Sequence, residues 1–279
     1  MNLYGLMITK DDHEVIDEWC HDQLDLDDAV VCLDGSNTDE TRRIVVKFSS
    51  RFVYLHEKQY SIPFKTDHGL RRVVHQEICR RFGLDNWIMC CHADEFCYHD
   101  PRKIAVKASQ ESYDLVAWFS VHFLPHPDEL GDFKQHQREP VYNRYRHYHW
   151  SYRSSGLPWL EHRLYQNGPA VFWDEITHGS MAPHHLNHPA PFHPILRHYK
   201  VFTTDLNCYQ LNGDSTLYRQ HWTALKHRTG LPIHLTRAED FFVRSFPPYE
   251  RCDRFEGVFN HSWNMREHCG IERGPCKYE

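Results

Sequence analysis

The chain has 279 residues, of which 41% are hydrophobic and 25% are charged, and its formal net charge is −6 at neutral pH. These figures are typical of a globular protein with a sizeable core. They argue against a disordered chain and against a strongly basic nucleic-acid binder. No apolar run approaches the ~20 residues that a membrane-spanning helix needs. The unusual number is 24 histidines, whose protonation in mildly acidic solution would reverse the sign of the net charge.

The start of the chain, residues 1–10, has no basic flank before a long apolar stretch, so it is not typical of a secretory signal. We therefore expect a cytoplasmic protein with no transmembrane segment. Its ten cysteines are expected to be reduced thiols rather than a disulfide framework. Adjacent Cys90 and Cys91 lie in an apolar run, which predicts that both are small buried hydrophobic side chains.

The first hundred residues alternate between short apolar runs and segments of helical periodicity. The apolar runs predict four strands, over residues 3–8, 29–33, 51–55 and 87–91. Helices are predicted after Asp11-Asp12, after Thr38 as the cap, and over residues 66–82. This alternation predicts parallel strands joined by right-handed crossovers.

In such a sheet, ligands bind beyond the carboxyl ends of the strands. Polar loops follow three of the predicted strands, at residues 9–12, 34–39 and 92–95. We expect these three loops to lie at one edge of the sheet. The second half of the chain is less regular, and residues 125–170 resist assignment. Further strands are predicted over 113–123, 170–173 and 200–202, and a helix over 215–226.

The most informative feature is His92-Ala93-Asp94-Glu95-Phe96, which follows a buried strand. Carboxylate oxygens are the ligands of hard divalent cations, and an imidazole can join them for Mn²⁺ or a later metal. A cation held there could neutralise a diphosphate leaving group. The alternative is a helix-capping acidic pair. A second feature, Asp34-Gly35-Ser36 with Asp39 and Thr41, could bind a base or ribose or could be an ordinary strand-to-helix turn.

Together, these two features resemble the nucleotide-sugar glycosyltransferases of the A-type (GT-A) fold, family 2 and its close relatives. The resemblance covers residues 3 to about 105 well. Three further segments are similar to family elements: the first loop at Met7–Asp12, the stretch His162–Asn167 with Phe172-Trp173 and Thr177-His178, and the late Leu196–Lys200. Asn37 departs from the pattern as an extra residue in the Asp-Gly-Ser turn.

The resemblance implies an α/β fold of the GT-A type, a Rossmann-like mixed central sheet flanked by helices, in a single domain over 1–279. Residues 1–105 would bind the nucleotide sugar, and residues 106–279 the acceptor. The implied activity is hexosyltransferase-type and metal-dependent, with Mn²⁺ implied first and Mg²⁺ second. A sugar would move with inversion from a nucleotide-diphosphate donor, above all a UDP-sugar. The acceptor hydroxyl would belong to a glycan, a lipid-linked molecule or a protein.

The resemblance also assigns site residues. Donor contacts fall to Thr9, Lys10, Asp11, Asp34, Ala93 and Asp94. Asp94 would bind the metal that bridges the two phosphates, and His198 would complete the site. His92 stands where the family's Asp-x-Asp has its first acid, and it could bind the metal, bond to the ribose or do neither. Histidine ligands must be neutral, so metal binding and activity are expected to fall below about pH 6.

Inversion needs a carboxylate that takes the proton of the acceptor hydroxyl. Gly179 stands where the family's Val-His-Glu pattern has an acid, close after His178. The candidates are therefore Asp174, Glu175 and the later Asp240, and each could equally be a solvated acid.

Two alternatives stay open. The histidines, five of them between residues 184 and 198, could serve a zinc-dependent hydrolase or deaminase, although the second cysteine of a deaminase Pro-Cys-x-x-Cys is missing after Pro275-Cys276. The chain could instead be an inactive nucleotide-sugar binder. Aromatic side chains at 142–159 could form an acceptor wall or simply pack together.

Overall fold

The computed structural model describes residues 1–13, 15–56, 69–124, 147–150, 160–173, 183–199 and 236–237. The chain divides into two compact units. The described residues of the first unit are 1–13, 15–56, 69–119, 160–173 and 183–196, and the remaining described residues belong to the second. The division into a donor half, 1–105, and an acceptor half, 106–279, stays a prediction.

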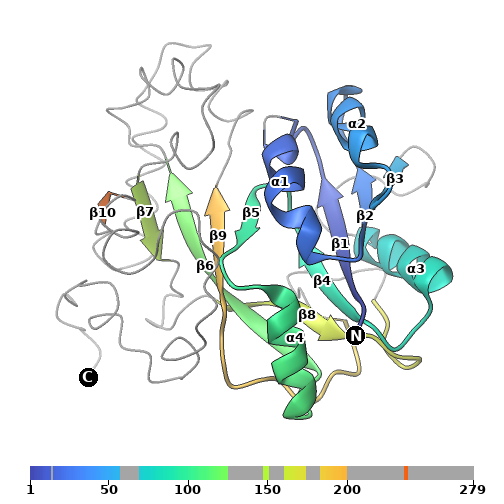
Figure 1. Cartoon of the computed structure of the whole chain (residues 1–279), viewed down its shortest axis with the longest axis vertical. Coiled ribbons are helices and arrows are strands. Elements are labelled where there is room, and N and C mark those ends of the chain that lie inside the picture. The colour runs from blue at the N-terminus through green and yellow to red at the C-terminus, as the bar shows by residue number, and fades with distance from the viewer. Residues whose placement is uncertain are drawn as a thin grey trace. The chain divides into compact units, whose positions relative to one another are not determined.

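The first unit is built on a mixed sheet (Figure 1). In the order in which they pair, its strands are β6 (Leu115–Leu124), β8 (Leu160–Gln166), β4 (Trp87–Cys91), β1 (Leu3–Thr9), β2 (Ala29–Asp34) and β3 (Phe52–His56). Neighbours among β4, β1, β2 and β3 run parallel, whereas β8 is antiparallel to both β4 and β6. The predicted fold class, a Rossmann-like mixed central sheet flanked by helices, is confirmed.

Helices cover both faces of this sheet. α1 (Ile16–Gln23) and α4 (Pro101–Gln110) lie in front of it in Figure 1, and α2 (Glu40–Val45) joins β2 to β3. α3 (Leu70–Phe82) packs on β1 and β2. Because both faces are covered, the strands are continuous apolar runs rather than alternating ones, and all six residues of β2 are buried.

Successive side chains of each strand point to opposite faces of the sheet, so they pack in two separate cores. On the α3 side, Leu6, Val31 and Leu33 of the sheet join Val74 and Ile78 of α3 in one buried cluster. On the other face, Trp19 of α1 lies with Met89 and Cys91 of β4 around a small cavity. Trp87 of β4 donates its Nε1–H to the hydroxyl of Ser109 in α4, 3.0 Å away.

Short strands continue the structure beyond this sheet. β5 (Glu95–Cys97) pairs with β9 (Ile195–Tyr199), which also pairs with β6. In the second unit, the end of β6 pairs antiparallel with β7 (His147–Trp150), and β7 with β10 (Thr236–Arg237). Within the described parts of the chain, no helix combines the length and the apolar character that crossing a bilayer requires.

The structure corrects several sequence-based expectations. Residues 170–173 form no strand; Phe172 makes a single bridge to His184. The helix expected to begin after Thr38 is capped by Asp39 instead, whose side chain makes no capping bond. α4 was not predicted, although its signal is plain: the side chain of Asp100 accepts from Arg102 N–H, and Pro101 occupies the first turn. The strand and helix predicted at 200–202 and 215–226 lie outside the described residues.

The prediction of reduced thiols is confirmed for every cysteine that the structure describes. Cys20, Cys32, Cys79, Cys90, Cys91 and Cys97 are free. Cys90 and Cys91 are buried, as the apolar run indicated. Burial raises the pKa of Cys32 and of Cys91 well above the ordinary thiol value, so both are inert packing groups rather than nucleophiles.

Gly5 of β1 supports a close approach of β2, which gives the first prediction. A Cβ atom at this position would lie 2.8 Å from Cγ2 of Val30 and 3.0 Å from Oδ2 of Asp27, both in the packed interior. We expect Gly5→Ala to lower the free energy of unfolding by about 1–3 kcal/mol, because an added methyl group in a well-packed core forces neighbouring side chains or backbone to shift. Gly168→Ala is the matched control, since nothing lies within 4 Å of its Cβ. Equal effects in denaturant unfolding would contradict the close approach.

Candidate functional site

The loops that follow β1 and β2 are bonded to each other at the carboxyl edge of the sheet. The N–H of Gly35 donates to the carbonyl of Thr9 (2.9 Å), and the N–H of Asp11 donates to the hydroxyl of Ser36 (2.7 Å). In the β-sheet register Thr9 lies opposite Asp34, while Met7 lies opposite Cys91 of β4. The three polar loops therefore share one edge, as the alternation of strands and helices predicted.

Asn37, the extra residue of the Asp-Gly-Ser turn, has a structural role. Asp11 adopts a left-handed backbone conformation with φ of 58°. Its carboxylate accepts from the backbone N–H of Asn37 (3.1 Å) and from the side-chain amide of Asn37 (3.2 Å). These bonds hold the first loop against the second. The nucleotide contact of Asp11 stays a prediction, as do those of Thr9 and Lys10.

Asp34 organises the Asp-Gly-Ser turn from inside. Its side chain is fully buried, with Oδ1 accepting from the N–H of Ser36 and Oδ2 from the hydroxyl of Tyr54, each at 2.8 Å. The hydroxyls of Ser36 and Thr41 lie 3.2 Å apart and link the turn to α2. Burial, followed by the bond to Asp34, raises the pKa of Tyr54. A contact between Asp34 and a nucleotide stays a prediction, since in this structure both carboxylate oxygens are buried and engaged within the protein.

The carboxyl group of Asp12 lies at this edge, within range of the charges of Asp94 and His92. Oδ2 of Asp12 accepts from the hydroxyl of Thr9 (2.7 Å) and from the N–H of Lys10 (3.0 Å). Burial and the negative charge of Asp94 raise the pKa of Asp12 to about 6, against the lowering effect of these bonds and of His92. We call Asp12, Asp94 and His92 the acidic corner. Asp12 was missing from the predicted site residues; its position beside Thr9–Asp11 in the same loop could have identified it.

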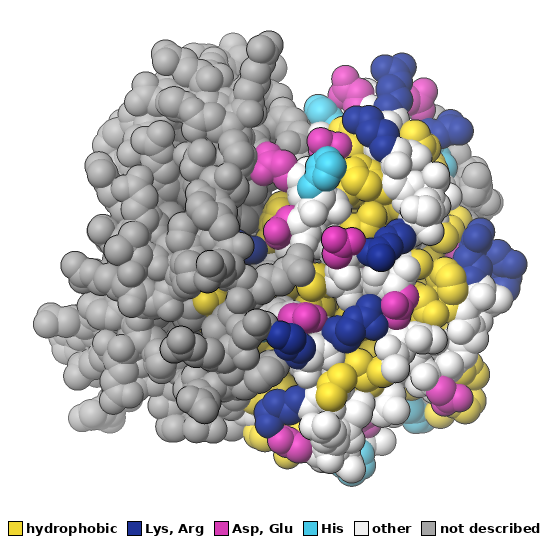
Figure 2. All heavy atoms as spheres, in the orientation of Figure 1, with side chains coloured by type: hydrophobic (Ala, Val, Ile, Leu, Met, Phe, Trp, Pro, Cys, Tyr) yellow, Lys and Arg dark blue, Asp and Glu magenta, His cyan; other side chains and the backbone are white. Residues whose placement is uncertain are grey.

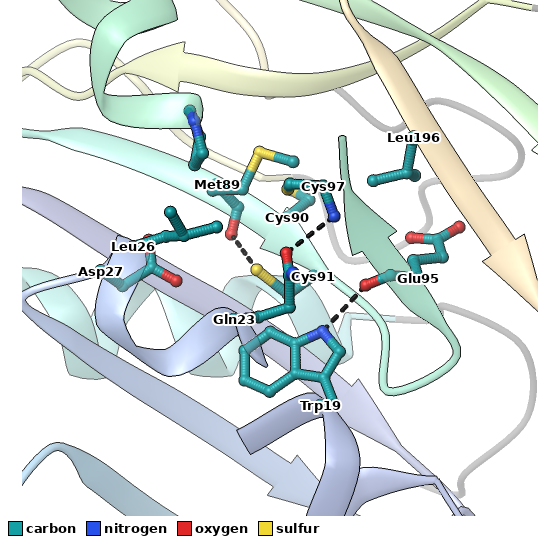
Figure 3. Close-up of a pocket in the computed structure, with 11 residues that line it drawn as sticks. Trp19, Gln23, Leu26, Asp27, Met89, Cys90, Cys91, Glu95, Cys97 and Leu196 are labelled. Atoms are coloured by element: carbon teal, nitrogen blue, oxygen red, sulfur yellow. Dashed lines mark hydrogen bonds between the residues drawn. The ribbon is translucent and has the colours of Figure 1, made fainter. Parts of the chain in front are cut away.

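Glu95 lies next to the acidic corner but is not part of it. Its side chain is 1% exposed and forms an ion pair with the equally buried Arg163 of β8, which also binds Glu161. Oε2 of Glu95 lies 3.5 Å from Nδ1 of His92. The carbonyl of Glu95 accepts from the indole N–H of Trp19 at 2.9 Å, as Figure 3 shows. Glu95 is therefore held by the core and not offered to solvent.

Arg163 reaches Glu95 because β8 is irregular at this point. Val116 of β6 lies opposite Leu164, whereas the next residue, Ala117, lies opposite His162. Arg163 is thus the extra residue of a β-bulge, a feature that redirects side chains beside functional sites. The resemblance had placed Arg163 in a family stretch without giving it a role.

A small cavity lies beside Glu95, lined also by Trp19, Gln23, Asp27 and Cys91 among others (Figure 3). Its volume of about 10 Å³ leaves room for about one water molecule, so it is no nucleotide site. Burial raises the pKa of Asp27 well above its ordinary range, against the lowering effect of Arg102. Gln23 accepts from the N–H of Cys97 at 2.7 Å and closes the cavity on the β5 side.

The donor atoms of the acidic corner suit a divalent cation. Two carboxylates and one imidazole are donors that Mn²⁺ accepts, and a cation would offset the negative charge of Asp94, which after burial is the second cause of the raised pKa of Asp12. Among the described residues, however, the structure contains no group of three or more His, Cys, Asp or Glu side chains placed so that they could hold a metal ion. His198 belongs to the second unit, so its place at this site stays a prediction.

Of the remaining predicted site residues, the structure describes Ala93 but not the candidate bases. Ala93 is fully buried between His92 and Asp94, backbone included, so its nucleotide contact stays a prediction. Asp174, Glu175, His178 and Asp240 lie outside the described residues. On the face seen in Figure 2, acidic and basic side chains of the described part intermingle.

Neither a protein-family model nor a curated protein matches the sequence. Similar solved structures include a mycobacterial protein, with 16% identity, a TM-score of 0.33 and coverage of 49% of this chain and 46% of that one. Another is the glucosyl-3-phosphoglycerate synthase from Mycobacterium tuberculosis in complex with Mn²⁺, UDP and glucosyl-3-phosphoglycerate. Its identity is 15% and its TM-score is 0.31, with coverage of 48% of this chain and 50% of that one. The chain spans about half the length of these structures, and similarity at this level carries no argument about function.

The raised pKa of Asp12 gives a prediction for pH-dependent stability. The folded chain holds this proton up to about pH 6, whereas an unfolded Asp releases it near 3.8, so the free energy of unfolding falls as pH rises between those values. Asp12→Asn removes this loss because an amide does not ionise in this pH range. Its oxygen can still accept the hydrogen bond from Thr9. We expect the variant to gain at most about 3 kcal/mol over wild type between pH 4 and pH 7.

Denaturant unfolding at several pH values measures this difference. Asp25→Asn is the control, because Asp25 is an acid whose side chain is 80% exposed. A gain for Asp12→Asn that is the same at pH 4 and pH 7.5 would contradict the raised pKa.

Proposed function

We propose that this chain is a metal-dependent glycosyltransferase of the GT-A type. It transfers a sugar, as a hexosyltransferase, from a nucleotide-diphosphate donor to an acceptor hydroxyl with inversion. The observation that supports this is the acidic corner: Asp12 and the His92-Ala93-Asp94 turn follow neighbouring parallel strands at one edge of the sheet, and the charges of Asp94 and His92 act on Asp12. Ligands of open α/β sheets bind at this edge.

The donor would lie across the loops that the structure binds together. Asp94 and Asp12 would supply carboxylate oxygens to Mn²⁺ or Mg²⁺, and His92 would supply an imidazole nitrogen. A cation held by these residues would supply positive charge to offset that of the departing nucleoside diphosphate. Thr9 and Lys10 fix the Asp12 carboxylate through their O–H and N–H groups, so it does not have to be ordered when the cation binds.

The remaining roles follow from the family resemblance. Thr9, Lys10, Asp11, Asp34 and Ala93 contact the nucleotide, for which UDP is the first choice. His198 completes the metal site. The acceptor is a glycan, a lipid-linked molecule or a protein, and its hydroxyl loses a proton to a carboxylate on the face opposite the nucleotide. Asp174, Glu175 and Asp240 are the candidates for that base.

One observation weighs against the zinc hydrolase alternative. That mechanism needs a glutamate close to the metal that is able to take up and release a proton. Glu95 is the acid that follows His92 and Asp94, and it is engaged with the buried guanidinium of Arg163. An ion-paired carboxylate of this kind is held ionised and is a poor proton shuttle.

Donor binding is tested by thermal unfolding. We expect UDP or GDP with Mn²⁺ to raise the Tm, because a ligand at 100 times its Kd stabilises the folded state by about 2.7 kcal/mol. Asp94→Ala should abolish the shift, whereas Asp25→Ala, at the amino end of β2, should keep it. If neither nucleotide shifts the Tm at millimolar concentration with Mn²⁺, the proposed donor site is wrong.

The base is identified by a separate comparison. We prepare Asp174→Asn, Glu175→Gln and Asp240→Asn and measure both sugar transfer and the affinity for UDP with Mn²⁺. Loss of the base should lower turnover about 10²- to 10⁴-fold with the nucleotide affinity unchanged. Full activity in all three variants would exclude these acids. A chain that binds the donor but neither transfers nor hydrolyses any sugar nucleotide would be the inactive binder.

A further inference from the structure

We propose that Glu95 is a positioning residue that fixes His92 in one tautomer. It holds the proton of the neutral ring on Nδ1, so that Nε2 keeps its lone pair for the donor site. This inference rests on the proposed function, since it explains how an imidazole can serve where related enzymes have a carboxylate. The assignment concerns the side chains of this chain alone and can be measured without any ligand.

The first step is the fixed position of the Glu95 carboxylate. Its side chain is 1% exposed, and Oε1 is bound to Nη2 of Arg163, itself 2% exposed. The bulge in β8 directs Arg163 toward Glu95, and the indole of Trp19 holds the carbonyl of the same residue. A carboxylate beside a buried guanidinium stays ionised, so it acts only as a hydrogen-bond acceptor.

The second step is the direction in which the imidazole faces. Nδ1 of His92 lies 3.5 Å from Oε2, the carboxylate oxygen that does not bind Arg163, which is within ion-pair range but longer than a hydrogen bond. A nitrogen that faces an ionised carboxylate is favoured to carry the proton, and in a neutral ring the other nitrogen then has the lone pair. Contacts of this length shorten when a site binds its ligand. The ring is 31% exposed, so a ligand can approach it.

The third step is the consequence for the cation. Carboxylates outside the first set of ligands commonly orient a metal-binding histidine through its other N–H, and their loss costs about 10- to 100-fold in affinity. A nitrogen donor favours Mn²⁺ over Mg²⁺, which prefers oxygen. Glu95 would thus contribute to cation choice without touching the cation.

The experiment reads the tautomer directly by ¹⁵N NMR of the ligand-free protein at pH 8.5, with His92→Gln identifying the resonances of His92. In wild type we expect a protonated Nδ1 and an unprotonated Nε2. In Glu95→Gln, the amide oxygen stays on Arg163 and the NH₂ group faces the ring, so the protonated nitrogen should switch to Nε2. Glu161→Gln, which removes the other carboxylate from Arg163 and keeps Glu95, should retain the wild-type pattern.

The result that overturns the proposal is a wild-type ring with Nε2 protonated, alone or together with Nδ1. The wild-type spectrum decides this even if Glu95→Gln fails to fold. An unchanged tautomer in a folded Glu95→Gln variant overturns it as well. Each of these results leaves the proposed function standing.

Calorimetry with UDP and Mn²⁺ tests the link to the donor. We expect Glu95→Gln to bind about 10- to 100-fold more weakly than wild type and Glu161→Gln to bind as wild type does. Equal affinity in Glu95→Gln and wild type refutes the role of Glu95 at the donor site. If wild type itself does not bind, the proposed function fails, and the NMR spectra still decide whether Glu95 orients the ring.

Discussion

The buried ion pair between Glu95 and Arg163 is the interaction on which the rest of the site depends. It joins the turn after β4 to β8, two segments that are 68 residues apart. Two charges taken out of water hold together only with good geometry, and removal of one partner from such a pair commonly costs about 3–5 kcal/mol. The bulge in β8 provides that geometry by directing Arg163 toward the turn. The positions of His92 and Asp94 follow, because both lie in the turn that Glu95 anchors.

The acidic corner is a different arrangement, because burial and a second carboxylate both act against the ionised form of Asp12. Asp12 is held by Thr9 and Lys10, yet burial and then the charge of Asp94 raise its pKa to about 6. Proteins commonly retain such unfavourable charge where a ligand offsets it, at a cost in stability. Glu95 is buried and ion-paired with Arg163, whereas Asp12 is half-buried and accepts its hydrogen bonds from Thr9 and Lys10.

The histidines show how far composition can mislead. His99 is fully buried, accepts from the N–H of Ile195 at 2.9 Å, and its pKa is lowered by burial to about 3. His75 bonds to Asn167 at 3.0 Å, and burial lowers its pKa also. These two rings are structural groups of the core. The large number of histidines therefore predicts neither a zinc site nor a uniform response to pH.

The sequence by itself determined the strands β1 to β4, their parallel order and the shared edge of three loops, because apolar runs of strand length and turn-forming residues are local signals. It also pointed to Asp94 and to the Asp-Gly-Ser turn. Only the tertiary structure decided which acids are available. Asp34 is buried and bonded to Tyr54, Glu95 is bound to Arg163, and Asp12 lies within range of the charge of Asp94. These partners are far apart in the chain, and a bulge or a pKa depends on through-space contacts that no local pattern encodes.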